Sequence, residues 1–379
     1  MLNAPHSQGN DARERPHTTV IASECEAIQS HAHDSGLLRR GACHLAALRA
    51  DPLAPRNDGV NQSTPRVISF MVRQLHNPQQ EPSCLPILMN SIETNATGRP
   101  MKSHPFGSTG VNVSVIGQGT WYLDRGDRNR AIAALRRGIE LGMTHIDTAE
   151  MYGDAELVIA EAIAGKREGL FLVSKVLPSN ASRKGTIAAC ERSLKRLKTD
   201  HLDCYLLHWR GSYPLAETVA AFEELERAGK IRSWGVSNFD ADDLDELAGV
   251  AGDGKIACNQ VLYHLKERAI EHAVIPWCEQ HKVAVVAYSP FGHDDFPSPR
   301  SKAGEVLARI ADAHGATPRQ VALAFLTRNT TVFAIPKASS AEHATENTNA
   351  GDLALSASEI SALDVAFPRR PTPRSLPML

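Results

Sequence analysis

Short apolar runs alternate with amphipathic segments from residue 111 to residue 370. Each apolar run is only a few residues long, which is typical of buried strands. The runs predict eight strands, at 113–116, 146–147, 171–175, 203–208, 231–236, 256–261, 283–288 and 332–335. The strand ends recur about every 30 residues, which is the length that one strand and its helix need.

The segments between the runs carry apolar residues at helical spacing. The clearest stripe joins residues that recur at i, i+3, i+7 and i+10, namely Ile187, Cys190, Leu194 and Leu197. Another helix is predicted to begin at Thr317, where the order Thr-Pro-Arg-Gln forms a capping box with Pro at the first helical position. Eight strands that each precede a helix, within about 250 residues, predict an α/β fold, a closed (β/α)8 TIM barrel.

Residues 1–100 differ from the rest of the chain. They are rich in Pro, Asn, Gln, Ser and His, and they show no sustained period of 2 or 3.6 residues. This composition predicts a disordered extension, or a start assigned too far upstream of a true start at Met101. Residues 1–7 lack the basic region and the apolar core of a secretory signal. We therefore divide the chain into an extension, 1–100, and a barrel domain, 101–379.

Charge and cysteine content narrow the class of protein. The 41 Lys and Arg residues nearly balance 43 Asp and Glu residues, so we expect no binding to nucleic acid or to an anionic membrane. No apolar run approaches the roughly 20 residues that span a bilayer. The seven Cys include no C-x-x-C pair, which argues against a zinc site and fits a reducing compartment. We expect a cytoplasmic monomer without a metal.

Polar residues stand where three predicted strands end. Asp147 ends the second strand, Lys175 the third and His208 the fourth, and Tyr152 follows Asp147 by five positions. In a parallel barrel these strand ends share the face that carries the active site. Each residue alone has a plainer interpretation, such as a turn former, a buried ion pair or a hydrogen-bonded core residue. The four together favour a catalytic site.

Eight motifs in order carry a resemblance to a known family. They are GQGTW (117–121), IDTAEMYG (146–153), VSKV (173–176), YLLHW (205–209), WGVSNF (234–239), CNQVLYH (258–264), AYSPFG (287–292) and IPKASS (335–340), followed by Glu346 and Asn347. From about residue 104 to residue 370 the chain resembles the aldo-keto reductases. Within that family it looks similar to bacterial small-aldehyde reductases of the methylglyoxal-reducing kind.

The resemblance implies NADPH-dependent reduction of small aldehydes and ketones by hydride transfer. Tyr152 would be the general acid, and His208 would donate a hydrogen bond to the carbonyl oxygen. A free phenol has a pKa of about 10, which is too high for efficient proton transfer near neutral pH. A neighbouring ammonium favours the phenolate, so Lys175 is expected to lower that pKa while Asp147 holds the ammonium.

The cofactor site has no G-x-G-x-x-G motif after a strand, so a Rossmann site is not expected. The resemblance implies that NADP(H) lies extended across the barrel mouth. The nicotinamide end would meet Thr120, Trp121, Ser237, Asn238, Gln260 and Tyr288. The pyrophosphate would meet Ser289, Pro290, Phe291 and Gly292. The 2′-phosphate and the adenine would meet Lys337, Ser339, Glu346 and Asn347.

One position departs from the family pattern. His343 stands where many members have Arg, six residues after Lys337. A neutral imidazole is a weaker phosphate partner than a guanidinium, so we expect a reduced preference for NADPH over NADH. The substrate pocket would be walled by Trp121, Tyr122 and Trp209, and the short loops at 210–214 and 293–300 predict an open pocket for small aldehydes.

Two other functions remain open at this point. The chain could be a cofactor-binding regulatory subunit with little turnover, as some relatives of the aldo-keto reductases are. It could also be a metal-dependent hydrolase barrel, which would need clustered His and carboxylate ligands at strand ends. Only His208 and Asp147 meet that requirement.

Overall fold

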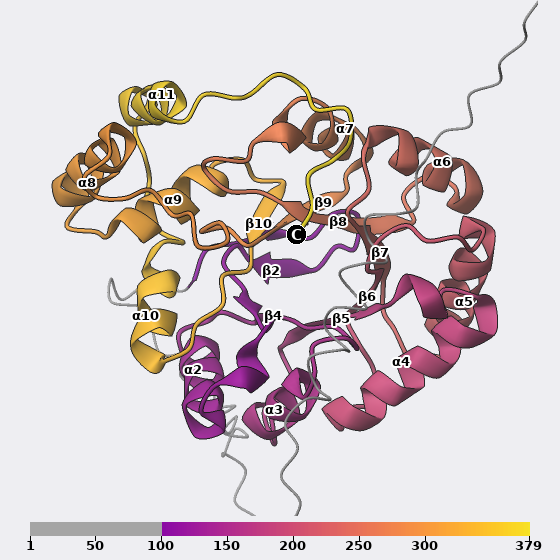
Figure 1. Cartoon of the computed structure of the whole chain (residues 1–379). Coiled ribbons are helices and arrows are strands. Elements are labelled where there is room, and N and C mark those ends of the chain that lie inside the picture. The colour runs from indigo at the N-terminus through magenta and orange to yellow at the C-terminus, as the bar shows by residue number, and fades with distance from the viewer. Residues whose placement is uncertain (1–100) are drawn as a thin grey trace, which may run out of the picture. The chain divides into compact units, whose positions relative to one another are not determined.

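The structure is a computed structural model, and it describes residues 101–379, so the prediction for 1–100 lies outside the described residues. An eight-stranded sheet forms the centre of this part of the chain, and every neighbouring pair of its strands is parallel (Figure 1). In spatial order the strands are β3 (Gln118–Gly119), β4 (His145–Asp147), β5 (Phe171–Val176), β6 (Cys204–Leu207), β7 (Trp234–Ser237), β8 (Ile256–Leu262), β9 (Ala284–Tyr288) and β10 (Val332–Ala334).

The sheet closes between β10 and the segment that enters β3. Ile116 pairs in parallel with Ala334, and the Gly117 amide donates to the Ala334 carbonyl at 2.8 Å. The Gly119 amide donates to the Pro336 carbonyl at 3.2 Å. A Cβ on Gly119 would lie 2.5 Å from the backbone oxygen of Ile335, so this close approach requires glycine. The predicted (β/α)8 barrel is confirmed.

Helices surround the sheet, as Figure 1 shows. They are α2 (Arg128–Glu140), α3 (Ala155–Ala162), α4 (Arg183–Leu197), α5 (Leu215–Arg227), α6 (Ala241–Ala251), α7 (Val274–His281), α8 (Lys302–His314), α9 (Pro318–Leu326), α10 (Ala341–Asn349) and α11 (Ala357–Ala366), with short 3-10 turns η1 (Leu123–Arg125), η2 (Pro178–Asn180) and η3 (Ala269–Glu271). The predicted capping box at Thr317 is present, with both of its hydrogen bonds to Gln320. Within 101–379 no helix has the length and apolarity that crossing a membrane requires.

The predicted strand 113–116 is only partly a barrel strand, because its last residue, Ile116, pairs with β10 whereas its first residues do not. Val113 belongs to β2 (Asn112–Ser114), which pairs antiparallel with β1 (Ser103–Pro105) in a separate hairpin. The barrel begins instead at β3. Hydrophobicity alone could not separate the two, because Val113 is buried as completely as a barrel residue. The sequence analysis also missed α11.

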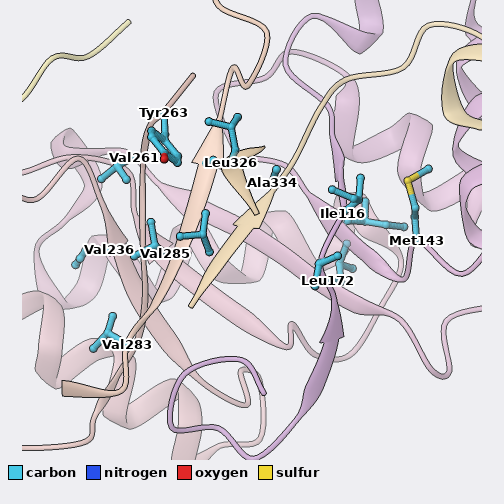
Figure 2. Packing of buried hydrophobic residues seen from close by; sticks show 14 of the residues in the cluster. Ile116, Met143, Leu172, Val236, Val261, Tyr263, Val283, Val285, Leu326 and Ala334 are labelled. Carbon is cyan, nitrogen blue, oxygen red and sulfur yellow. The ribbon is translucent and has the colours of Figure 1, made fainter. Parts of the chain in front are cut away.

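The hairpin closes the barrel at the amino-terminal ends of its strands. The Phe106 ring follows β1 and lies 4.7 Å from the ring of Phe171 and 5.1 Å from that of Phe333, centroid to centroid. A second, larger apolar cluster packs between the strands and the helices, and Figure 2 shows part of it around Ile116, Leu172 and other buried residues. The rings around Phe106 fill the inside of the barrel at the amino-terminal ends of the strands, and the polar residues at the carboxyl ends lie at the opposite end of the barrel.

Four cysteines of the described chain are free and buried: Cys190, Cys204, Cys258 and Cys278. Burial raises the pKa of the Cys190 thiol to about 12. It also raises the pKa of the Cys258 and Cys278 thiols. The sulfurs of Cys190, Cys258 and Cys278 are therefore protonated and inert packing groups at neutral pH.

Glu271, at the end of η3, forms ion pairs with several arginine side chains. Its carboxylate pairs with Arg268 at 2.7 Å and with Arg328 at 3.1 Å. Burial opposes its ionisation, but hydrogen bonds from Arg268 and Tyr263 outweigh that effect and lower the pKa from 4.5 to about 2. A carboxyl with a depressed folded-state pKa stabilises the fold above its unfolded pKa, and this contribution is lost as pH falls toward the folded value.

We therefore expect Glu271→Gln to lower the free energy of unfolding at neutral pH. The difference from the parent protein should shrink as the pH falls from 4.5 toward 2, because the parent carboxylate then becomes protonated. Urea unfolding of both proteins at several pH values measures this. A difference that stays constant across that range would contradict the assignment.

Candidate active site

Asp147 and Lys175 form an ion pair inside the barrel, at the carboxyl ends of β4 and β5. Lys175 Nζ lies 2.6 Å from Asp147 Oδ1 and donates a second hydrogen bond to the Thr148 carbonyl at 2.8 Å. Gln260 Nε2 donates to the other Asp147 oxygen at 2.8 Å. The side chain of Lys175 is 0% exposed and that of Asp147 is 2% exposed, so each charge is compensated mainly by the other.

Tyr152 and His208 complete the group. The Tyr152 hydroxyl lies 3.4 Å from Lys175 Nζ and 3.4 Å from His208 Nε2. His208 directly follows β6, and its amide donates to the Val176 carbonyl at 3.0 Å, which fixes its backbone to β5. The structure thus brings the four predicted residues together, although they come from three separate segments of the chain.

Protonation in this group is governed by burial and by the Lys175 charge. Burial opposes the charge on Lys175, but Asp147 and Tyr152 outweigh it and raise the pKa of the ammonium. Burial and the nearby ammonium hold the pKa of His208 well below its ordinary value, so the imidazole is neutral. Lys175 acts on the Tyr152 phenol in the expected direction and lowers its pKa, but this effect does not set the net shift. Burial of the hydroxyl raises that pKa, and the ammonium only partly opposes it.

Aromatic rings stand beside these four residues. The Trp121 ring stacks on Tyr122 at 4.4 Å between centroids and lies 6.5 Å from the Tyr152 ring. The Trp209 ring lies 4.9 Å from that of His208. Tyr122 has the positive φ of 60°, an uncommon backbone conformation for a non-glycine residue. All three predicted wall residues therefore lie around one spot.

The nicotinamide end of the predicted cofactor site is joined by hydrogen bonds. Tyr288 donates from its hydroxyl to Asn238 Oδ1 at 2.9 Å, and Asn238 Nδ2 donates to the His208 carbonyl at 3.1 Å and to Ser237 Oγ at 3.2 Å. The amide of Leu379 donates to the Tyr288 hydroxyl at 3.4 Å, so the C-terminal tail reaches this spot, as Figure 1 also shows.

Two residues predicted for the nicotinamide end already have partners within the barrel. Thr120 Oγ1 donates to the Asp147 carbonyl at 2.8 Å. The Gln260 amide nitrogen donates to the Asp147 carboxylate, so only its oxygen is uncommitted among the described contacts. Both side chains are buried and hydrogen-bonded to Asp147.

The segment predicted for the pyrophosphate is a tight turn after β9. Its sequence is Ser289, Pro290, Phe291 and Gly292, and the Gly292 amide donates to the Ser289 carbonyl at 2.8 Å. Gly292 has a φ of +78°, and a Cβ there would lie 1.9 Å from an oxygen of Asp295. Glycine is therefore required for the chain to turn at this position.

Lys337 and the start of α10 form the far end of the predicted cofactor site. Lys337 is exposed and has no carboxylate partner among residues 101–379. Ser340 caps α10 and accepts from the His343 amide at 3.3 Å, while Ser339 Oγ and His343 Nδ1 are 3.5 Å apart. A free ammonium beside a helix amino terminus suits an anionic group.

Glu346 and Asn347 lie further along α10. Glu346 is half-buried and accepts from Thr317 Oγ1 at 2.7 Å, which joins α10 to the start of α9. Asn347 is buried. The structure therefore places both residues on the same helix as His343, next to the end of the predicted site.

A protein-family model described as "Aldo/keto reductase family" matches residues 115–366. The chain belongs to the aldo-keto reductases. This membership confirms the resemblance and removes the alternative of a metal-dependent hydrolase. In this aldo-keto reductase, no three His, Cys, Asp or Glu side chains of residues 101–379 are grouped so as to hold a metal ion.

Individual aldo-keto reductases are similar over most of their length. Methylglyoxal reductase YeaE of Escherichia coli is 49% identical over 262 residues, which is 68% of this chain and 92% of that protein. Glyoxal reductase of Bacillus subtilis is 34% identical over 258 residues, 67% of this chain and 89% of the relative. A crystal structure of an aldo-keto reductase from Klebsiella pneumoniae in complex with NADPH is 45% identical, with a TM-score of 0.69. The match covers 74% of this chain and 100% of the Klebsiella chain.

The sequence analysis missed one residue at the mouth of this aldo-keto reductase. The His293 ring, from the loop after β9, stacks against the ring of Trp121 with centroids 5.9 Å apart. The contact joins two loops that are far apart in the sequence. No spacing or motif in either loop signals it, so only the folded structure could reveal it.

Proposed function

We propose that this protein is an NADPH-dependent reductase of small aldehydes and ketones, including 2-oxoaldehydes such as methylglyoxal. The observation that carries the proposal is the position of the Tyr152 hydroxyl, 3.4 Å from both Lys175 Nζ and His208 Nε2. The methylglyoxal and glyoxal reductases among the relatives support the choice of substrate. We propose that the barrel domain, 101–379, acts as a monomer in the cytoplasm.

The residues present fit the cofactor. Lys337 offers an unpaired cation beside the amino terminus of α10, which suits the 2′-phosphate. Asn238 and Tyr288 form a hydrogen-bonded pair next to His208, and their polar atoms suit the nicotinamide end. When bound, NADPH supplies the hydride that reaches the carbonyl carbon of the substrate.

The protein supplies the proton and the polar surroundings for the carbonyl oxygen. Negative charge develops on that oxygen, and donors already aimed at it stabilise the transition state. Neutral His208 can donate one hydrogen bond and orient the carbonyl, while Tyr152 donates the proton. Since burial keeps the phenol protonated at neutral pH, Tyr152 enters the reaction in its acid form. The Lys175 ammonium then stabilises the phenolate that is left.

A screen of NADPH oxidation over aldehydes and ketones tests the proposal, with Tyr152→Phe as the inactive control. Consumption of NADPH with methylglyoxal supports reductase function. Tight NADPH binding without turnover of any carbonyl would instead favour the regulatory subunit. Steroids turned over far better than methylglyoxal or nitrobenzaldehyde would contradict the small-aldehyde pocket.

We expect NADPH to bind more tightly than NADH, but by a modest factor. His343 cannot form the bidentate contacts that Arg makes with phosphate. The variant His343→Arg should therefore bind NADPH about tenfold more tightly, which corresponds to about 1.4 kcal/mol, and leave NADH affinity unchanged. Fluorescence titration of both cofactors gives the dissociation constants.

Lys337→Met tests the proposed contact with the 2′-phosphate in the opposite direction, by removing a cation. It should weaken NADPH binding and leave NADH binding nearly unchanged, because NADH lacks the 2′-phosphate. Equal affinities of the parent protein for the two cofactors, or tighter binding of NADH, would refute the assignment.

A further inference from the structure

Tyr152 lies on a loop of irregular backbone between β4 and α3, whereas Lys175 and His208 stand on or beside strands. The contacts of its hydroxyl with these residues are 3.4 Å long, so a small displacement of the loop would break them. The proposed reaction therefore requires that the loop be held against β5. Two groups of contacts, one on each side of the tyrosine, do this.

The first group centres on Glu150, two residues before the tyrosine. Its amide donates to the Lys175 carbonyl at 3.2 Å. Its carboxylate is 11% exposed and accepts from the Leu177 amide at 2.7 Å, from Asn180 at 2.9 Å and from the Arg192 guanidinium at 3.1 Å. This carboxylate thus joins the loop to the end of the lysine's strand and to α4.

The second group centres on Arg196, also on α4. Its guanidinium donates to the Gly153 carbonyl at 2.5 Å, to Asp154 at 3.1 Å and to Glu156 at 3.0 Å. Glu156 is almost fully buried, and its other oxygen accepts from Ser174 Oγ at 3.0 Å. Because Ser174 precedes the lysine on β5, this group also connects the loop to that strand.

Arg192 and Arg196 are four positions apart on α4 and therefore share one face of the helix. We propose that these two residues form an arginine clamp that grips the loop on both sides of Tyr152 and sets the position of its hydroxyl relative to Lys175. The inference rests on the proposed function. Neither arginine contacts the phenol or the ammonium, so both are positioning residues.

The clamp predicts a change in pH dependence. The titratable groups that face the phenol are Lys175 from β5, Asp147 from β4, neutral His208 from the end of β6 and Tyr288 from β9. Of these, only the ammonium favours the phenolate, and its effect weakens with distance. A small displacement of the loop leaves the phenol buried but further from the ammonium, which raises the phenol pKa. Since the reaction needs the protonated phenol, the loss of activity at high pH should then shift to higher pH.

Arg196→Lys is the sharpest test. The lysine keeps a positive charge beside buried Glu156, but a single ammonium cannot reproduce the fork that reaches three acceptors. We expect kcat for methylglyoxal to fall about tenfold with little change in KM, because the acid is misplaced. The alkaline limb of the kcat profile should move to higher pH, and hydrogen exchange over residues 150–154 should accelerate.

Arg183→Lys is the matched control. Arg183 lies on the same helix and pairs with Glu224 at 2.8 Å, away from the tyrosine loop. This variant should keep the parent kcat, pH profile and exchange rates. Arg192→Gln provides a second test in the event that Arg196→Lys does not fold, since Arg192 is largely exposed and Glu150 keeps its other two partners.

The outcomes separate the clamp from the proposed function. A lower kcat with a shifted alkaline limb and faster exchange supports the clamp. An unchanged kcat, or a lower kcat with an unmoved alkaline limb, overturns it. Failure of the parent protein to oxidise NADPH with any carbonyl overturns the proposed function instead, whatever the variants do.

Discussion

Tyr152→Phe should lower kcat for methylglyoxal reduction about 10³-fold, the scale expected when a positioned general acid is lost. The change removes one oxygen and leaves the ring in place. Lys175 keeps its hydrogen bonds to Asp147 and Thr148, so the ion pair below the phenol is preserved. We therefore expect the variant to fold normally and to bind NADPH with the parent affinity.

Steady-state kinetics and cofactor titration on the same preparation check this expectation. His208→Gln is a useful comparison, because an amide can still donate a hydrogen bond but cannot reproduce the imidazole geometry. It should lose less activity than the phenylalanine variant. If Tyr152→Phe retained a tenth or more of the parent kcat, another group would have to be the acid.

Lys175→Met should have the largest effect on stability, lowering the free energy of unfolding by about 3–5 kcal/mol. Its removal leaves the Asp147 carboxylate buried, with Gln260 as the donor that remains to its side chain. Activity should also be lost, because nothing then stabilises the Tyr152 phenolate. Urea unfolding gives the stability difference, and NADPH oxidation gives the residual rate.

The double variant Asp147→Asn with Lys175→Met separates these two effects. Removing both charges takes away the uncompensated carboxylate, so most of the lost stability should return. Activity should stay absent, since the ammonium is still missing. A double variant that is less stable than Lys175→Met alone would show that the unpaired Asp147 charge is not the main cause of the lost stability.

Much of the barrel and its catalytic group could be predicted because polar residues mark the ends of the strands. Asp147, Lys175 and His208 each end or directly follow a short apolar run, and parallel strands in a barrel bring such ends to one face. The cofactor positions depended on the family resemblance. Their roles stay predictions, although the structure brings Ser237, Asn238 and Tyr288 together beside the same spot.

The errors have physical causes that sequence patterns cannot express. Val113 is as apolar as a barrel residue, but its backbone pairs with β1, and hydrophobicity does not encode pairing partners. The contact of His293 with Trp121 depends on how two loops fold over the mouth. For Tyr152, the sequence revealed the ammonium but not the depth of burial, which decides the direction of the pKa shift.

The buried thiols of the barrel have a consequence for a protein whose proposed substrates are 2-oxoaldehydes. Such compounds are electrophiles, and the form of a cysteine that reacts with them is the nucleophilic thiolate. Cys190, Cys204, Cys258 and Cys278 offer neither access nor, where burial raises the thiol pKa, an appreciable thiolate fraction. The described part of the chain can thus work in a high concentration of its own proposed substrate without its sulfur atoms being derivatised.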